Sequence, residues 1–293
     1  MVKVIVVGSS AIDFVVTTKV RPDKGETIIG EGFKTVPGGK GANQAVAAAR
    51  LGAEVSLIGC VGTDLFGEQI LNNLSENQVL TYMMKKLKNI ESGTAHITLA
   101  DFDNSIIVIK GANDFITPNL IEQHRDAIEK ADIVLVQQEV PEETVITVVE
   151  MCHQVGVSVI LNPAPARSLP KTILEKATYL TPNEHEANVL LGVSDYRNVL
   201  ARYPNKIFVT EGKDGVRYHN GEHEVVIPGY QVDVVDTTGA GDTFNAAFAV
   251  AIAEGSTINQ SLKFANRAAA LSVTQFGAQG GMPSRVIVDN FMK

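Results

Sequence analysis

Short apolar runs separated by helical patterns place the strongest restriction on how this chain can fold. The runs have the length of strands and do not alternate with polar residues, which is typical of parallel strands buried on both faces. They lie at residues 2–7, 54–59, 133–137, 157–161, 179–180 and 207–210. The helical patterns at 43–51, 141–155 and 184–191 each end at a glycine, which favours helix termination. The sequence therefore predicts a doubly wound α/β fold, with a mostly parallel sheet flanked by helices.

Two segments depart from this alternation of strands and helices. Residues 14–36 and 94–110 contain apolar runs beside polar and glycine residues, and Asp101-Phe102-Asp103-Asn104 has the composition of a hairpin turn. We expect antiparallel strands around 27–36 and 94–110 that form a small β-sheet lid over the carboxyl ends of the main strands. Because no internal repeat or long linker interrupts the chain, we expect residues 1–293 to form a single domain.

The composition narrows the class of protein. The chain has 293 residues, 45% of them apolar and 20% charged, with a net charge of −8. This balance excludes a disordered chain, and an acidic chain is poorly suited to bind nucleic acid through its phosphates. No apolar run of about 18 residues predicts a membrane span, and residues 2–7 have the pattern of a strand rather than a signal peptide. Cys60 and Cys152 lie in no metal-binding or disulfide pattern, so we expect two buried thiols in a cytoplasmic protein.

A first glycine-rich loop, Pro37-Gly38-Gly39-Lys40-Gly41-Ala42-Asn43, directly precedes an alanine-rich helical pattern. Three glycines let the backbone approach a ligand closely, and the start of a helix favours an anion. Lys40 and Asn43 add a cation and an amide, which suit hydroxyls or an anion. From these residues alone, a turn with a solvated lysine is an equal alternative. The loop is not a Walker A sequence, because the glycine required upstream of Gly39-Lys40 is absent.

A second glycine-rich loop, Asp236-Thr237-Thr238-Gly239-Ala240-Gly241-Asp242-Thr243-Phe244, precedes another alanine-rich helix at 245–253. Its small residues leave backbone N–H groups free at a helix start, where they can hold a phosphate oxygen or developing negative charge. Asp242 in this first turn could serve the helix dipole, or it could accept a proton from a substrate hydroxyl. The loop by itself leaves both roles open.

Together, the two loops resemble those of the ribokinase-like (PfkB) family of carbohydrate kinases. Three further motifs stand between them in the family's order: Asn162-Pro163-Ala164-Pro165-Ala166, Thr181-Pro182-Asn183-Glu184 and Thr210-Glu211-Gly212-Lys213-Asp214-Gly215. The resemblance runs from the first strand to about Ser284. It implies the ribokinase-like fold and an ATP-dependent kinase that phosphorylates the 5-hydroxyl of D-ribose.

The resemblance also implies the catalytic and sugar-binding residues. Asp242 would be the general base, and Gly239, Ala240 and Gly241 would form the anion hole for the transferred phosphoryl group. The sugar would lie among hydroxyl-binding side chains and the first loop. These sugar-binding residues are Asp13, Gly39, Lys40, Gly41, Ala42, Asn43, Glu139 and Asp242. Without the resemblance, Asp13 could be a turn residue at a strand end and Glu139 a solvated loop acid.

For the nucleotide and the cations, the implied residues follow the same motifs. The nucleotide-binding set is Asn183, Thr210, Glu211, Gly212, Lys213, Asp214, Gly215, Gly241 and Asn266, the last beside the adenine. Glu186 would hold Mg²⁺ through water. A monovalent cation, usually K⁺, would be bound mostly by backbone carbonyls of Asp236, Thr238, Ser272, Gln275, Gly277 and Gly281. Lys213 and Asp214 would fit a plain surface turn equally well.

Two positions depart from the family pattern. Gly281 stands where a serine is common. Ala11-Ile12-Asp13 stands where members read Asn-x-Asp, in which the asparagine binds a ribose hydroxyl. Loss of one such hydrogen bond costs about 0.5–1.5 kcal/mol. Either ribose binding is weaker here, or the natural substrate lacks that hydroxyl, as 2-deoxyribose does.

The sequence also allows other functions, and the resemblance implies one partner, a second copy of the chain. The rival functions are a kinase of 2-deoxyribose, another sugar or a nucleoside, and a sugar-binding regulator without catalysis. An NAD-linked enzyme is disfavoured, since residues 8–13 lack the G-x-G-x-x-G spacing. The resemblance implies a homodimer in which two lids clasp each other, which would bury apolar lid side chains such as Ile28, Phe33 and Ile97.

Overall fold

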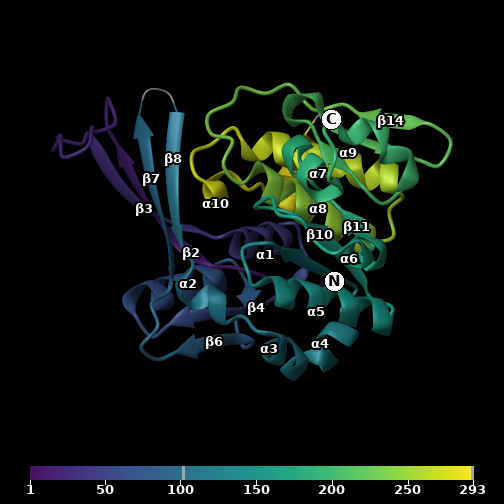
Figure 1. Ribbon diagram of the computed structural model, residues 1–293, viewed down its shortest axis with the longest axis horizontal. Helices are drawn as coiled ribbons and strands as arrows, with labels where there is room; N and C mark the ends of the chain where they lie inside the picture. The colour runs from purple at the N-terminus through teal and green to yellow at the C-terminus, as the bar shows by residue number, and fades with distance from the viewer. Residues whose placement is uncertain (101–102, 292–293) are drawn as a thin grey trace.

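A parallel sheet forms the centre of the protein, whose computed structural model describes residues 1–100 and 103–291. The strands run in the order β11-β10-β9-β1-β4-β5, with β6 also paired to β4, and every pairing is parallel. Their bounds are β1 Lys3–Val7, β4 Glu54–Gly62, β5 Val79–Leu80, β6 Met84–Leu87, β9 Ile133–Gln137, β10 Ser158–Asn162 and β11 Tyr179–Leu180. The prediction of a doubly wound α/β fold is confirmed (Figure 1).

Both faces of this sheet are buried, which explains why its strands read as continuous apolar runs. In β1, Val4 and Val6 face one core cluster, whereas Ile5 and Val7 face the other. The first cluster lies against α1 Lys40–Arg50, α2 Leu65–Glu76, α8 Ala240–Ala253, α9 Ile258–Ser272 and α11 Arg285–Asn290. The second lies against α3 Pro118–Gln123, α4 Arg125–Glu129, α5 Glu142–Val155, α6 Lys171–Lys176 and α7 Glu184–Leu191.

The glycines expected to end helices do so. Gly156 and Gly192 follow α5 and α7 in the left-handed conformation, with φ of 75° and 64°. The starts of α1 and α8 differ from expectation, because both helices begin inside the glycine-rich loops, at Lys40 and Ala240. The loops therefore supply the first helical turns themselves. In α1, the N–H groups of Lys40 and Ala42 donate to Glu139 and Ser9, which follow strands of the central sheet.

A second, four-stranded sheet extends away from the helical layers (Figure 1). Its order is β3-β2-β7-β8, with bounds β2 Ala11–Thr17, β3 Gly32–Gly38, β7 Gly93–Ala100 and β8 Asp103–Ile109. The expected antiparallel strands are confirmed, since β2 pairs antiparallel with β3 and β7 with β8. The two antiparallel pairs are joined by a parallel pairing of β2 with β7. Residues 27–30, expected in a strand, form none. Of the expected hairpin turn, residues 101 and 102 lie outside the described residues.

This second sheet begins where β1 ends, and that places Asp13. Residues 8–10 connect β1 to β2, and Asp13 lies within β2 rather than in a turn at a strand end. Of the apolar lid residues, Phe33 is 62% exposed. Ile28 and Ile97 are half-buried within the chain itself.

The remaining elements complete the nucleotide side of the molecule. A small antiparallel sheet contains β12 Val209–Thr210, β13 Val216–His219 and β14 Glu224–Ile227. Single parallel bridges join Leu180 to Ile207 and Asn183 to Thr210, so this sheet continues the edge of the central one. Short elements are α10 Ala278–Gly281 and the 3₁₀ helices Gly111–Phe115, Tyr196–Asn198, Leu200–Arg202 and Gly212–Asp214.

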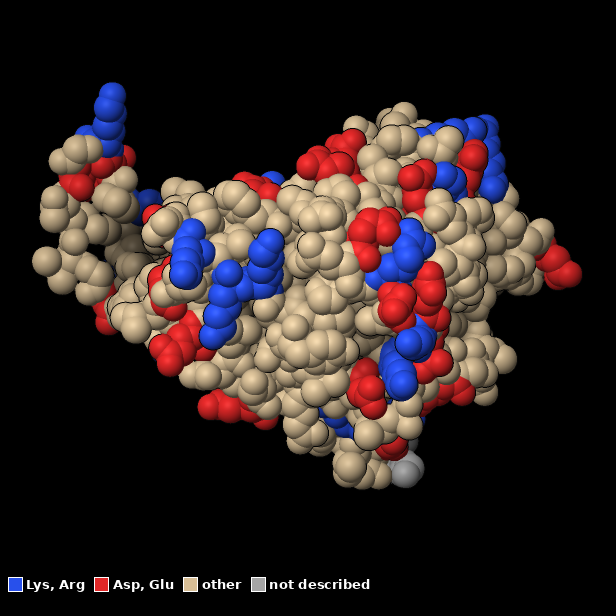
Figure 2. Space-filling model, turned by 90° about the horizontal axis from the view of Figure 1, so that it is seen from below, with Lys and Arg blue, Asp and Glu red and all other residues tan. Residues whose placement is uncertain are grey.

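Charged side chains are distributed over the surface. On the face shown in Figure 2, lysine and arginine alternate with aspartate and glutamate rather than forming one extended patch of a single sign. Within residues 1–100 and 103–291, the helices are all too short or too polar to cross a bilayer.

Candidate active site

The first glycine-rich loop packs so closely against the connection between β1 and β2 that it leaves no room for side chains at its glycines. A Cβ atom on Gly41 would lie 2.5 Å from the carbonyl carbon of Gly8, and one on Gly38 would lie 2.3 Å from Oδ1 of Asp13. Gly39 has a φ of 87°, which side-chain-bearing residues rarely adopt. The glycines thus allow the start of α1 to lie directly against the Asp13 carboxylate.

Glu139 joins the same loop from the end of β9. Its Oε2 accepts hydrogen bonds from the backbone N–H of Lys40, at 2.9 Å, and from the Ser9 hydroxyl. The side chain is half-buried, so Glu139 is not the solvated loop acid that the residues alone allowed. The structure therefore brings Asp13, Lys40 and Glu139 together, as the sequence predicted.

Asp242 lies in the first turn of α8 and is 5% exposed. Its Oδ2 accepts a hydrogen bond from Asn43 Nδ2 at 3.0 Å, and its Oδ1 accepts one from Gln44 Nε2 at 3.1 Å. The carboxylate consequently faces α1 across the contact between the two helices. This arrangement is not that of a simple helix cap, because both side-chain donors come from a different helix.

The carboxylates of this site oppose each other, and Lys40 balances them. Burial, together with the charges of Glu139 and Asp242, raises the pKa of Asp13 to about 6. The pKa of Lys40 is also raised, chiefly by Asp242 and further by Glu139 and Glu186, although burial opposes the shift. Lys40 therefore stays protonated among the carboxylates of Asp242, Glu139 and Glu186.

Two neighbouring cavities meet at the start of α8. The first, of about 240 Å³, is lined by Lys40, Asn183, Glu186, Gly239 and Asp242, among others. The second, of about 390 Å³, is more apolar and extends between the loop after β12 and helix α9. They share Thr210, Thr237 and Gly241. A polar compartment around Asp242 thus opens into an apolar one large enough for a planar ring.

Most of the residues expected to bind the nucleotide line these two cavities, together with further residues that were not expected. Thr210, Gly212, Lys213, Gly215 and Asn266 line the apolar cavity. Asn266 Nδ2 also donates to the carbonyls of Ile227 and Pro228, which braces the segment that follows β14. Sequence reasoning missed the apolar wall, because its residues carry no polar signature. These residues are Tyr230, Val232, Val234, Phe244, Ala269, Ala270 and Val273.

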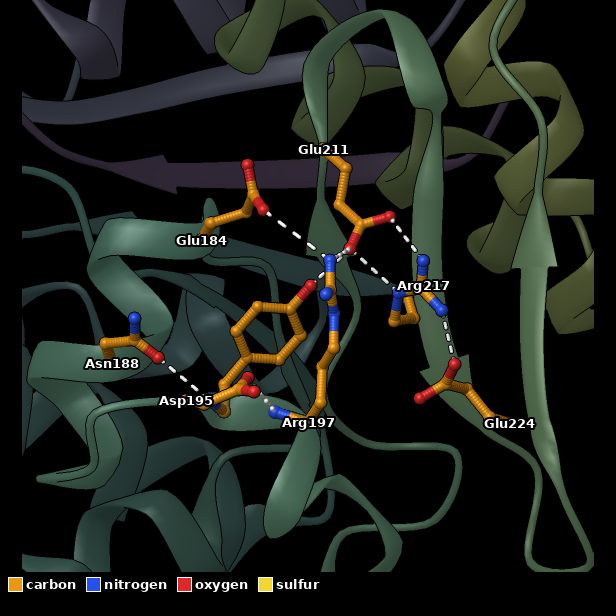
Figure 3. Close-up of polar contacts among 8 residues, drawn as sticks. Glu184, Asn188, Asp195, Arg197, Glu211, Arg217 and Glu224 are labelled. Atoms are coloured by element: carbon orange, nitrogen blue, oxygen red, sulfur yellow. Dashed lines mark hydrogen bonds and ion pairs between the residues drawn. The ribbon is translucent and has the colours of Figure 1, made fainter.

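Glu211 and Asp214 are not among the residues that line the two cavities. The Glu211 carboxylate is buried beside β13, where it accepts hydrogen bonds from Arg217 Nε at 2.7 Å, Arg197 Nη2 at 3.2 Å and the Tyr196 hydroxyl (Figure 3). Burial raises the pKa of Glu211, but these hydrogen bonds outweigh it and lower the pKa to about 2. Glu211 therefore holds the loop from its outer side.

Just before the start of α8, the residues expected to hold a monovalent cation are partly assembled. Asp236 Oδ1 accepts hydrogen bonds from the N–H and hydroxyl of Thr238, and Oδ2 accepts one from the Gly277 N–H at 2.9 Å. Burial opposes ionisation of Asp236, but these bonds outweigh it and lower its pKa. A Cβ on Gly281 would lie 1.9 Å from the Ser272 carbonyl oxygen, so a serine could not replace Gly281 here without a backbone shift. Gln275 is exposed.

Glu186 is the expected Mg²⁺ residue. It lines the polar cavity at the start of α7, and its Oε2 accepts a hydrogen bond from the Asn183 N–H within a capping box. Burial raises its pKa, partly offset by that hydrogen bond and by Lys40. Among the described residues, no three His, Cys, Asp or Glu side chains are grouped closely enough to hold a metal. This fits Mg²⁺, which is usually held by one or two carboxylates together with substrate phosphates.

Comparison with known proteins identifies the family. Residues 1–285 match the pfkB family of carbohydrate kinases. This chain belongs to the pfkB family. It is 58% identical over 292 residues to the ribokinase of Bacillus subtilis, with all of both chains covered. It is 37% identical to the deoxyribokinase of Salmonella typhi, with 95% of each chain covered.

Solved structures agree with this assignment. The Arabidopsis thaliana ribokinase complexed with ribose and ATP superimposes with a TM-score of 0.92 at 34% identity, covering 100% of this chain and 99% of that one. Membership of the pfkB family confirms the prediction of a carbohydrate kinase and of the ribokinase-like fold.

The raised pKa of Asp13 predicts a pH-dependent effect on stability. An acid whose folded pKa is raised destabilises the folded state above that pKa, and the penalty disappears as the pH falls from about 6 toward 3.8. We expect Asp13→Asn to increase the free energy of unfolding by about 1–3 kcal/mol at pH 8 and by much less at pH 4.5. Urea unfolding at both pH values measures this. The exposed Asp233→Asn is the control, and an equal effect of Asp13→Asn at both pH values would contradict the prediction.

Proposed function

We propose that this pfkB-family protein is a ribokinase, which transfers the γ-phosphoryl group of ATP to the 5-hydroxyl of D-ribose. The observation that carries the proposal is the position of Asp242. Its buried carboxylate lies between the carboxylates that suit a sugar, Asp13 and Glu139, and a polar cavity that opens into the apolar one. The ribokinases of B. subtilis and A. thaliana support ribose and ATP as substrates.

The sugar site is built from acceptors and donors that match a ring of hydroxyls. Asp13 and Glu139 supply carboxylate acceptors, Asn43 supplies an amide, and the backbone of Gly39, Gly41 and Ala42 lines the approach. These elements meet because Gly38 and Gly41 allow contact at backbone distance. D-Ribose binds here with its 5-hydroxyl toward Asp242.

Asp242 acts as the general base. Each of its oxygens accepts one hydrogen bond from α1 and keeps lone-pair capacity for the proton of the 5-hydroxyl. The hydroxyl oxygen forms a bond to the γ-phosphorus, the proton passes to Asp242, and the bond to the bridging oxygen breaks, so that ADP leaves. The Ala240 N–H donates to the Thr237 carbonyl at 3.3 Å, and the N–H groups of Gly239 and Gly241 beside it stabilise the negative charge on the transferred group.

The nucleotide and its cations occupy the remaining parts of the two cavities. The adenosine lies in the apolar cavity, with Asn266 and the Thr210–Gly215 loop on its walls, and Asn183 approaches the phosphates. Glu186 would hold Mg²⁺ through water, and the ion would supply positive charge to the phosphates. Asp236, Thr238, Ser272, Gly277 and their neighbours would hold K⁺, which would add positive charge near the anion hole.

Replacement of the base tests the mechanism directly. We expect Asp242→Asn to lower kcat by about 10²–10⁴-fold, since the amide cannot accept the proton, with binding of D-ribose largely kept. Coupled ADP release measures turnover, and calorimetry measures ribose binding. Wild-type turnover in the variant would remove Asp242 from the role of base.

A 2-deoxyribokinase is the second candidate, because Ala11 presents no hydrogen-bonding side chain at the position where family members bind a ribose hydroxyl. The S. typhi deoxyribokinase is among the relatives. The test is ADP formation with Mg²⁺ and K⁺ on D-ribose, 2-deoxy-D-ribose, adenosine and no sugar. Preference for deoxyribose would favour the second candidate, and no sugar-dependent turnover would favour another substrate or a sugar-binding regulator.

The same panel applied to Ala11→Asn tests the role of this position. An added amide gains about 0.5–1.5 kcal/mol of hydrogen bonding to ribose, so we expect the KM for D-ribose to fall by about 2- to 10-fold while the KM for deoxyribose does not fall. An unchanged or higher KM for D-ribose would contradict this account of Ala11.

A homodimer formed through the lid completes the proposal, in a protein of the cytoplasm. Residues 106–109 of β8 expose four apolar side chains, and Ile107 is 69% exposed. Such an edge strand is a surface that proteins usually cover.

The two cysteines are consistent with a protein of the cytoplasm. Burial raises the pKa of Cys60 to about 11 and of Cys152 to about 12, so both thiols resist oxidation, as suits either a reducing compartment or a closed core.

Disruption of this strand tests the dimer. We expect the wild-type protein to sediment at twice the chain mass of 31.4 kDa, and Ile107→Glu to sediment as a monomer because the charge is buried at the interface. Val286→Glu, at an exposed apolar position of α11, is the matched control. A monomeric wild type, or a dimeric Ile107→Glu, would contradict the lid interface.

A further inference from the structure

A chain of buried side-chain amides leads from the central sheet to Asp242. Gln137, at the end of β9, donates from Nε2 to Gln44 Oε1 at 2.7 Å. Gln44 in turn donates from Nε2 to Asp242 Oδ1 at 3.1 Å and to Asn162 Oδ1 at 3.2 Å. The chain therefore joins two strands of the sheet, β9 and β10, to the acidic side chain on α8.

Gln44 cannot act on a substrate by contact. Its side chain is fully buried, whereas Asn43, the other donor to Asp242, belongs to the proposed sugar site. The bond from Gln137 occupies Gln44 Oε1, so the NH₂ group of Gln44 is the end that faces Asp242. The orientation of Gln44 is thus set by a residue of the sheet core.

Space for this arrangement exists because residue 8 is glycine. A Cβ on Gly8 would lie 2.1 Å from Gln137 Oε1 and 2.7 Å from the Cα of Gly41. The same glycine therefore admits both the amide chain and the sugar-binding loop. Asn162 extends the chain by donating to the Thr181 carbonyl at 3.3 Å, next to the polar cavity.

We propose that Gln44 is a positioning residue for phosphoryl transfer, which fixes the rotamer of Asp242. The inference rests on the proposed function, in which Asp242 is the base. A carboxylate held by hydrogen bonds on both of its oxygens aims its remaining lone pairs at one place. Gln44 thereby acts on the rate of transfer rather than on sugar affinity.

Charged groups around Asp242 are the same in every variant compared below. Lys40 faces it from α1, Asp13 from β2 and Glu186 from α7. A change in kcat between wild type and a Gln44 variant therefore reports the lost amide rather than a changed neighbour.

The experiment compares Gln44→Met with Gln138→Met in ribose-dependent ADP formation. Gln138 is as deeply buried as Gln44, and its side-chain amide has no hydrogen-bond partner among the described residues. We expect Gln44→Met to lower kcat by about 10- to 100-fold, the effect of one lost hydrogen bond to a charged group. The KM for D-ribose stays within about 3-fold, because Gln44 does not contact the sugar.

Each outcome separates this inference from the proposed function. Gln138→Met retains wild-type kcat if the inference holds. A Gln44→Met enzyme with wild-type kcat, a loss carried by KM alone, or an equal loss in Gln138→Met would overturn it while the ribokinase proposal stands. A wild-type protein without sugar-dependent turnover would overturn the proposed function and this role together.

A second variant covers failure of Gln44→Met to fold, which thermal unfolding and circular dichroism detect. Gln137→Met leaves Gln44 in place but removes the bond that orients it. We expect a smaller loss in kcat, about 3- to 10-fold, again without a change in the KM for D-ribose. An unchanged kcat in a folded Gln137→Met protein would overturn the inference.

Discussion

The contact between the first turns of α1 and α8 is the interaction on which the rest of this site depends. A buried carboxylate is tolerated only when it is hydrogen-bonded, and Asp242 receives both of its side-chain donors, Asn43 and Gln44, from α1. The two helices approach closely because their facing turns are rich in alanine, and Ala45 and Ala246 lie in one core cluster. If Asn43 and Gln44 were replaced by apolar residues, Asp242 would be left buried and without its side-chain donors.

That contact also accounts for the electrostatics of the site. It brings Asp242 toward Asp13, whose pKa is raised by burial and by its acidic neighbours, and toward Lys40, whose pKa is raised chiefly by Asp242. The folded protein therefore holds charged groups in an arrangement that is unfavourable by itself. Such groups are useful where a ligand supplies their missing partners, as sugar hydroxyls and phosphates do. The burial and acidic neighbours that suit Asp13 to bind a ligand therefore also lower the free energy of unfolding.

Much of the candidate site was predictable, because its residues lie in contiguous motifs. Both glycine-rich loops, Lys40 and Asp242 meet at one cavity. Gln44 was missed because a single amide within an alanine-rich helix has no partner nearby in the sequence, and its partners lie 93, 118 and 198 residues away. Glu211 shows the opposite limit of contiguous motifs. It stands within the motif expected to bind the nucleotide, yet Arg217 and Arg197 hold its carboxylate and it does not line the two cavities.

The sequence by itself determined the α/β class and which apolar runs form the central strands. It also determined the helix ends at Gly156 and Gly192 and the two glycine-rich loops with the residue types they carry. These features depend on local conformation and on periodicity, which neighbouring residues carry. Only the tertiary structure decided that β2 pairs in parallel with β7, that α1 and α8 begin inside their loops, and that sheet residues orient the amide facing Asp242. Each of these depends on contacts between residues far apart in the chain, and their free energy appears only when the layers pack.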